Sequence, residues 1–330
     1  MKSCFTISLA TLSLAVIVAN TAHASEPEFP MPKLTMFSSL GAASVEGKDF
    51  DPEAFELELG IKGLVKLDTF KLVYILNADV SDAINSKDTG GADGEADIHV
   101  KDAKVVLPTK YGTFVIAPRT ASGQLRDLYS NINIFEYNET HSGSVTPSGM
   151  AIFNQSSEAQ DTLVYITPAF NHTKVTFASI SIPEDNGVDS DVFAVRALYD
   201  DKTFNIGIGA VQADKTLAGT ATENYSRYAM TAGYQFEQFS LGATYEINQE
   251  TFGTNGDFDA YGVAGRYQLG KGLSLAAGYY DKDSDVDAND NNGVVVQLKK
   301  DFSKNVAAWV EAADYDNTAD NVAAGINITF

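Results

Sequence analysis

Apolar and polar side chains alternate along most of this chain, and this pattern restricts the possible folds more than any other feature. In residues 239–247, one set consists of Phe239, Leu241, Ala243, Tyr245 and Ile247, and the other of Ser240, Gly242, Thr244 and Glu246. Successive side chains of a β-strand point to opposite faces of the sheet. The alternation therefore predicts strands with one apolar face and one polar face.

The sequence excludes insertion into a membrane as helices. After residue 24, no run of 18 or more apolar residues occurs, and a spanning helix needs about 20. The mean hydropathy is −0.11. A transmembrane β-barrel has an average of this kind because only alternate residues face lipid. A soluble, secreted β-protein also fits this composition.

Turn residues divide the alternating pattern into sixteen predicted strands, for example 225–236 and 238–248. The connections are alternately short, as at residues 171–172 and 237, and long, as at 81–96, 118–160, 183–190 and 282–292. An even strand number, with tight turns at one end and longer loops at the other, is typical of bacterial outer-membrane barrels. We therefore predict an all-β fold, a transmembrane antiparallel β-barrel of about 16 strands.

The first 24 residues have the form of a secretory signal peptide. Lys2 precedes an apolar stretch, Leu9 to Ala19, and Ala22-His23-Ala24 is a small-x-small cleavage motif. We expect export through the periplasm with cleavage between Ala24 and Ser25. Residues 25–330 then form a single barrel domain. The only cysteine, Cys4, lies in the leader, so the mature chain is expected to have no disulfide.

The final predicted strand, residues 321–330, ends on Phe330. It resembles the closing strand of bacterial outer-membrane barrels. The resemblance implies that Phe330 is part of the assembly signal read by the barrel assembly machinery, and that the destination is the outer membrane with its lipid and lipopolysaccharide. In hydrocarbon, an open sheet edge leaves backbone groups unpaired. The last strand should therefore pair with the first, near Lys33 to Ala42.

The longest predicted connection, residues 118–160, is the candidate functional segment, because long loops in compact domains are usually functional. The stretch from Arg119 to Tyr129 resembles the entry of the third loop in Gram-negative general porins. This resemblance covers leader, strand count, loop order and terminal Phe, although the Pro-Glu-Phe-Gly-Gly-Asp sequence of enteric porins is absent. It implies a third loop folded into the lumen, a homotrimer, and passage of ions and small hydrophilic solutes.

Porin constrictions have loop carboxylates facing cations on the wall, and this resemblance supplies candidates for a pore constriction. The acidic candidates in and beside the loop are Asp127, Glu136, Glu139, Glu158 and Asp161. The basic candidates are inward-facing wall residues and two residues at the loop entry: Lys62, Lys104, Arg196, Arg227, Arg266, Arg119 and Arg126. Charged rings set ion preference.

The charge of the chain points away from nucleic acid. Cleavage would remove one of the 23 basic residues and leave 22 against 44 acidic ones, so a polyanion would be repelled. The run 281–290 alternates Asp with other residues, but Val286 stands where an EF-hand needs Gly. We expect no cofactor and no structural metal, with only loose divalent cations at acidic outer loops.

Catalysis has little support in the sequence. The histidines beyond the leader are His99, His141 and His172, and they form no recognisable catalytic motif. We therefore expect a passive channel and no enzyme. Two alternatives stay open. One is a channel selective for sugars or oligosaccharides, for which Tyr129, Phe135, Tyr137 and Phe153 could supply an aromatic slide. The other is a non-channel outer-membrane protein acting in structure or adhesion.

Overall fold

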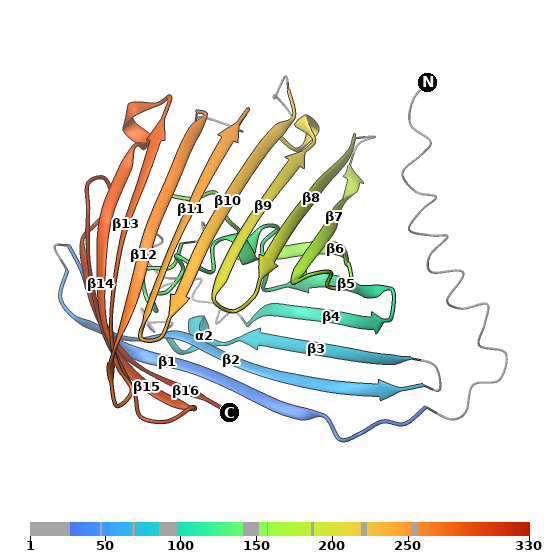
Figure 1. Cartoon of the computed structure of the whole chain (residues 1–330), viewed down its shortest axis with the longest axis horizontal. Coiled ribbons are helices and arrows are strands. Elements are labelled where there is room, and N and C mark those ends of the chain that lie inside the picture. Colours follow the sequence, from blue (N-terminus) through green and yellow to red (C-terminus); the bar gives the residue numbers. More distant parts are fainter. Residues whose placement is uncertain are drawn as a thin grey trace, which may run out of the picture.

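The computed structural model describes residues 27–46, 48–67, 70–85, 98–140, 152–156, 158–185, 188–218, 223–251 and 256–330; the leader lies outside them. In this part of the chain, sixteen antiparallel strands close into one barrel (Figure 1). The strands are β1 (Lys33–Val45), β2 (Asp51–Lys66), β3 (Lys71–Asp79), β4 (His99–Thr109), β5 (Gly112–Thr120), β6 (Ala159–Ile166), β7 (Thr173–Asp185), β8 (Val188–Asp200), β9 (Phe204–Ala213), β10 (Tyr225–Phe236), β11 (Phe239–Gln249), β12 (Phe258–Gly270), β13 (Leu273–Ser284), β14 (Asn291–Asp301), β15 (Val306–Tyr315) and β16 (Asn321–Thr329).

The barrel closes where the sequence predicts. β16 pairs antiparallel with β1 in an unbroken register from Phe37↔Thr329 to Val45↔Asn321. Phe330 extends this pairing, because its N–H donates to the Met36 carbonyl at 2.9 Å. Closure pairs the edges of the first and last strands, as hydrocarbon requires.

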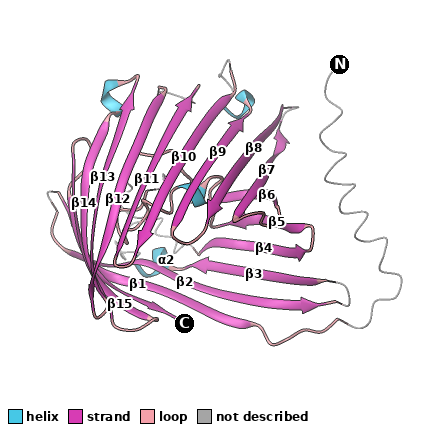
Figure 2. Ribbon diagram, in the orientation of Figure 1, coloured by secondary structure: helices cyan, strands magenta, loops and turns pink. Residues whose placement is uncertain are grey.

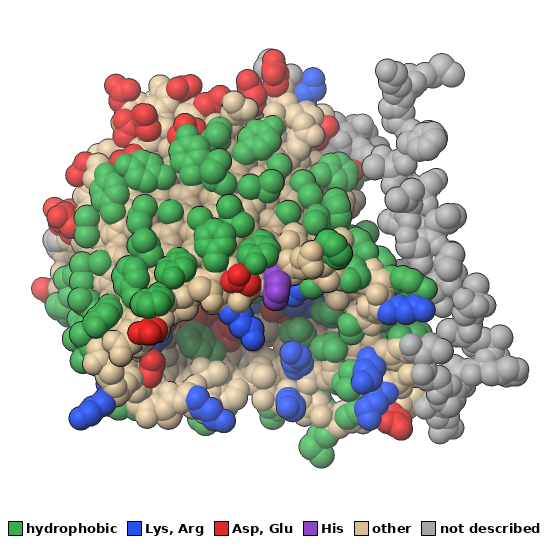
Figure 3. Space-filling view, viewed as in Figure 1, with side chains coloured by type: hydrophobic (Ala, Val, Ile, Leu, Met, Phe, Trp, Pro, Cys, Tyr) green, Lys and Arg blue, Asp and Glu red, His purple; other side chains and the backbone are tan. Residues whose placement is uncertain are grey.

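The two faces of the strands also follow the predicted alternation. On β10, Tyr228 and Met230 are 47% and 53% exposed, whereas Arg227 and Thr231 are buried. Each strand contributes exposed apolar side chains. On the face of the barrel drawn in Figure 3, such side chains form a broad band. This band gives the barrel a lipid-compatible exterior.

Among the residues that the structure describes, helices are confined to connections (Figure 2). They are α2 (Ser81–Asn85), η1 (Arg126–Leu128), η2 (Lys215–Ala218) and η3 (Asp287–Asn289). No helix in the described ranges has the length and apolar character that a membrane span requires. One predicted long loop, 183–190, is wrong: β7 and β8 run on to Asp185 and from Val188, so two residues separate them.

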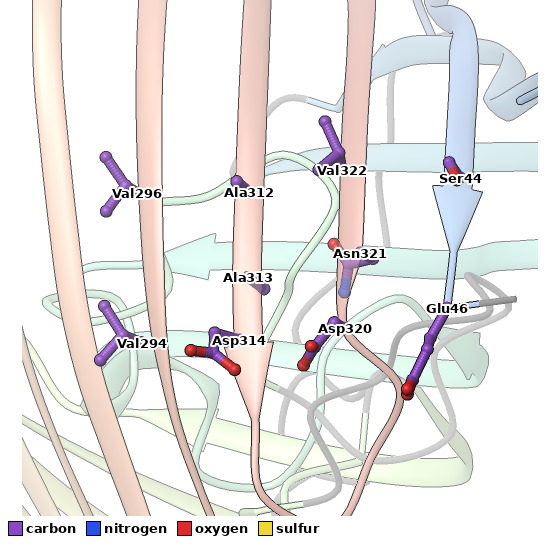
Figure 4. Close-up of a pocket in the computed structure, with 10 residues that line it drawn as sticks. All are labelled: Ser44, Glu46, Val294, Val296, Ala312, Ala313, Asp314, Asp320, Asn321 and Val322. Atoms are coloured by element: carbon purple, nitrogen blue, oxygen red, sulfur yellow. The ribbon is translucent and has the colours of Figure 1, made fainter.

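A groove of about 570 Å³ lies on the outer surface where β14, β15, β16 and β1 meet (Figure 4). Val296, Ala312 and Val322 form its apolar part, and the acidic residues Glu46, Asp314 and Asp320 lie toward the loop end. The groove results from small side chains on the lipid-facing side. It is therefore separate from the lumen.

Candidate functional site

The connection between β5 and β6 folds into the barrel, as predicted for residues 118–160, but the strands leave only 121–158 outside them. Its side chains Leu125, Leu128 and Ile132 are fully buried and belong to one cluster with inward residues of the wall. A loop that buries such side chains against the wall gains roughly 1.5–3 kcal/mol for each. The hydrophobic effect therefore holds this loop inside the lumen.

Glycines on β9 to β11 make room for the loop. A Cβ atom at Gly209 would lie 2.7 Å from Leu125 Cδ2, and one at Gly242 would lie 2.6 Å from the Asn131 carbonyl oxygen. Inward-facing glycine thus lets the loop backbone approach the wall closely. This glycine seat, by which we mean the inward-facing glycines of β9 to β11 that the loop packs against, was not predicted from the sequence. Glycine recurring on the inward face of successive strands was the signal that could have revealed it.

Two buried carboxylates on the wall tether the loop. Glu246 of β11 accepts hydrogen bonds from the Tyr129 hydroxyl and from the Asn154 N–H, the latter at 2.8 Å. Burial, followed by the charge of Glu246, raises the pKa of Tyr129, so its hydroxyl remains a donor. The second tether, Glu311 of β15, accepts the N–H groups of Glu136 and Asn138, both at 2.8 Å.

The loop leaves an open cavity on the other side of the lumen, against β1 to β4. Its volume is about 460 Å³. Residues of the loop and of these four strands line it together, among them Phe37, Ser39, Glu56, Glu58, Asp79, Lys101, Arg126, Glu136, Glu139 and Glu158. Within the described residues, this cavity is the part of the lumen that the loop narrows.

Charges at this cavity are mixed within the wall itself. Lys101 of β4 forms ion pairs with Glu56 and, at 2.7 Å, with Glu58 of β2. On the neighbouring side, Glu158 contacts His99 Nε2 at 2.7 Å and Arg119 at 3.5 Å. Carboxylates outnumber cations among the cavity's charged residues.

The wall of β1 to β4 therefore carries carboxylates as well as cations beside the loop, in addition to the loop acids that the prediction named. Glu56, Glu58, Asp79, His99 and Lys101 were missed because the family pattern directed attention to cations on the wall. The signal was present in the sequence, since Glu56 and Glu58 lie two residues apart and share a face with Lys62.

The structure brings some predicted site residues to the cavity and places others elsewhere. Arg126, Glu136, Glu139 and Glu158 line it. Glu136 also pairs with Lys299 of β14. Arg119 reaches this lining through its contact with Glu158 at 3.5 Å, whereas Lys104 lies outside it and is bound to Asp102 at 2.6 Å.

The remaining predicted cations lie under the loop or away from the cavity. Arg227 is only 2% exposed and donates to Gln124 Oε1 at 3.1 Å, so it does not face open lumen. Arg196 pairs with Asp127 at 2.8 Å. Arg266 donates to the Ile134 carbonyl at 2.5 Å. These arginines attach the loop to the wall, because the loop covers the side from which they project.

Two further predicted residues lie outside the cavity lining. Lys62 is exposed on β2, nearer the short-turn end. Asp161 is exposed on β6 with a φ of 46°, a left-handed conformation that interrupts the regular alternation there. The alternation therefore cannot assign Asp161 to the constriction.

The predicted aromatic slide is not formed by the four loop aromatics. Tyr129, Phe135, Tyr137 and Phe153 are between 0% and 5% exposed. Tyr137 packs edge-on against Phe55 with ring centroids 5.1 Å apart, and Phe153 packs in the same manner against Tyr129. Their faces are used to pack the loop against the wall, so they offer little surface to a passing solute.

An apolar cylinder with a polar interior, narrowed by an inserted loop, defines a membrane channel of the porin class. The family model described as Gram-negative porin matches residues 10–320. The chain belongs to this family, and it forms an outer-membrane channel for small solutes. No protein of curated function matches it significantly.

Solved structures of low identity share the fold. Salmonella typhi OmpF in complex with daunomycin has a TM-score of 0.73 at 15% identity, covering 92% of this chain and 100% of that one. The loop L8 deletion mutant of Vibrio cholerae OmpT has a TM-score of 0.69 at 17% identity, covering 91% of this chain and 99% of that one. An anion-selective porin from Comamonas acidovorans has a TM-score of 0.68 at 13% identity, covering 93% of this chain and 100% of that one.

Proposed function

We propose that this channel is a passive, water-filled pore for ions and small hydrophilic solutes, with a preference for cations. The observation that carries the proposal is the acidic cavity beside the loop, where Lys101 is already shared by Glu56 and Glu58. A cleft lined mainly by one sign of charge concentrates the opposite ions. We infer that Arg126, Glu136, Glu139 and Glu158 belong to this constriction, and that transport involves no catalytic step or cofactor.

The alternatives from the sequence receive less support. A sugar-selective channel would need exposed aromatic faces, and the four candidate rings are buried. A structural or adhesive barrel would have no need of a charged cavity beside an inserted loop. The acidic loop end of the barrel, seen along the upper edge of Figure 3, supports loose attraction of divalent cations and, through them, of lipopolysaccharide phosphates. Within the described residues, no group of three or more His, Cys, Asp or Glu is placed to hold a metal ion.

Neutralising Glu56 and Glu58 together by glutamine should reduce the cation preference. The change removes the two carboxyl groups that contact Lys101 most closely. We expect the cation-to-anion permeability ratio to fall at least about twofold, because one-signed clefts raise local counter-ion concentration by about tenfold or more. The ratio is measured as a reversal potential in a salt gradient. Glu237→Gln, in an exposed short turn, is the control. A permeability ratio equal to that of wild type would show that Glu56 and Glu58 do not set the cation preference.

We also propose that Phe330 is an assembly signal, that the leader is cleaved near Ala24, and that the mature barrel is a homotrimer. The support for the trimer is that Vibrio cholerae OmpT, which shares the fold, is described in a trimer form. Phe330→Ala should lower the amount of folded trimer in outer-membrane fractions, seen as heat-modifiable migration on gels. Phe302→Ala, which removes another exposed aromatic from a short turn, should assemble normally. Equal yields of folded trimer from Phe330→Ala and wild type would argue against the assembly signal. A monomeric mass of the wild-type protein in mild detergent would argue against the homotrimer.

A further inference from the structure

We propose that the lumen is electrically bipolar along its axis and that the channel therefore rectifies ionic current. An acidic zone lies at the constriction, and a basic zone lies between it and the mouth formed by the short turns. The inference rests on the water-filled pore proposed above. It adds a directional property that a simple cation preference does not include.

Strand β2 alone displays both zones. Leu59 and Ile61 are exposed on the outer surface. Successive side chains of a strand point to opposite faces, so Glu58, Gly60 and Lys62 face the lumen. From Glu58 to Lys66 the pairing with β3 is unbroken, and alternation is therefore maintained. Glu58 contacts the acidic cavity, whereas Lys62 lies four residues further along, about 13 Å away at 3.3 Å per residue.

The basic zone continues across neighbouring strands. Lys62 is paired with Lys33 of β1 on one side and with Ile75 of β3 on the other. Ile75 is in turn paired with Lys104 of β4. Because directly paired residues point to the same face of a sheet, these three lysines form one band across the lumen wall of β1 to β4.

A second pair of lysines lies closer to the mouth. Lys66 is paired with Lys71 at the ends of β2 and β3. Carboxylates offset part of this charge, since Glu28 contacts Lys66 at 3.0 Å and Asp102 contacts Lys104 at 2.6 Å. Five lysines against two carboxylates leave this wall positive. Lys and Arg side chains gather along the lower edge of Figure 3, opposite the acidic edge.

Two zones of opposite charge in series make conduction depend on polarity. Cations enter readily through the acidic zone at the loop side, and anions enter readily through the basic zone at the short-turn side. A potential that is positive on the loop side drives both kinds of ion toward the junction, where they accumulate and carry current. The opposite potential draws ions from the junction, while each mouth excludes the ion that could replace them. Current should therefore be larger when the loop side is positive.

Single-channel current–voltage curves of the wild-type protein in planar bilayers test this directly. We expect the currents at equal and opposite voltages to differ about twofold or more in ~10 mM KCl, where the Debye length is ~30 Å, and to become equal in ~1 M KCl, where it is ~3 Å. Asn289→Cys, biotinylated and bound by streptavidin in one chamber, marks the loop side through partial block. Symmetric curves at low salt, or larger current with the loop side negative, would overturn the inference.

Paired variants separate bipolar charge from channel shape. Lys62→Gln with Lys71→Gln should abolish rectification and increase cation preference. Glu56→Gln with Glu58→Gln should also abolish rectification but decrease cation preference. Lys300→Gln, on the outward side of β14 next to lumen-facing Lys299, should change neither. Rectification that survives both double variants would overturn the inference. A channel that conducts symmetrically would still satisfy the proposed function, whereas a folded barrel without conductance would remove that function itself.

Discussion

Replacing Glu311 by alanine should release the tip of the inserted loop and give channels with larger and more variable conductance. The Glu311 carboxylate is 1% exposed. It accepts the backbone N–H groups of Glu136 and Asn138, both at 2.8 Å, and side-chain amides of Asn138 and Gln297 at 2.9 and 2.8 Å. Each buried donor left without a partner costs about 1–3 kcal/mol. The seated loop should therefore lose about 3 kcal/mol or more relative to a displaced one.

The measurement is a distribution of single-channel conductance, compared with the unfolding midpoint of the barrel in detergent. Glu311→Gln keeps the volume but replaces one acceptor oxygen with a donor, so its effect should lie between those of alanine and wild type. Glu237→Ala removes an exposed carboxylate from a short turn and should leave conductance unchanged. A narrow, wild-type distribution for Glu311→Ala would show that the loop is held without this tether.

Gly242→Val should have the opposite effect and narrow the pore. A Cβ atom at this position would lie 2.4 Å from Asn131 Cβ and 2.6 Å from the Asn131 carbonyl oxygen. Carbon atoms prefer separations of about 3.5–4.0 Å, so the loop must retreat from the wall by about 1 Å or more. Because the cavity lies on the far side of the loop, this retreat takes place at the expense of the open lumen.

We expect single-channel conductance to fall, with a loss of about 1–3 kcal/mol in stability from overpacking. Ala243→Val places the same side chain on the adjacent, exposed outer face of β11 and is the matched control. The two variants distinguish strand propensity from contact with the loop. If both variants conduct like wild type, the glycine seat does not set the position of the loop.

The barrel itself was largely predictable from the sequence, because strands that face lipid on one side and water on the other show the alternation directly. The predicted strand 225–236 coincides with β10, and the predicted pairing of the last strand with the first is confirmed. The family and the channel function were also correctly indicated. The loop 183–190 was misjudged because turn residues do not reveal how far paired strands extend beyond the lipid.

The arrangement of charges was much less predictable. Alternation correctly placed Arg227 on the inward face, but it could not show that the loop would cover that residue. Whether a lumen-facing charge is open to solutes depends on where an irregular loop of some 40 residues lies, and no short-range pattern records that position. The tethers Glu246 and Glu311 were equally hidden, because a buried carboxylate on a strand has the same sequence pattern as a wetted one.

The buried hydrogen-bond tethers of the inserted loop lie on one half of the cylinder, at Glu246 on β11 and Glu311 on β15, as do the glycines of β9 to β11. On the other half, Tyr137 of the loop packs against Phe55. The passage is consequently eccentric, and it is bounded by the loop and the first four strands. The residues that tether the loop and the residues of the wall that face passing solutes therefore lie on different strands. Substitutions on β1 to β4 can retune which solutes pass while the anchorage on the opposite half stays intact, so permeability is free to diverge without jeopardising assembly.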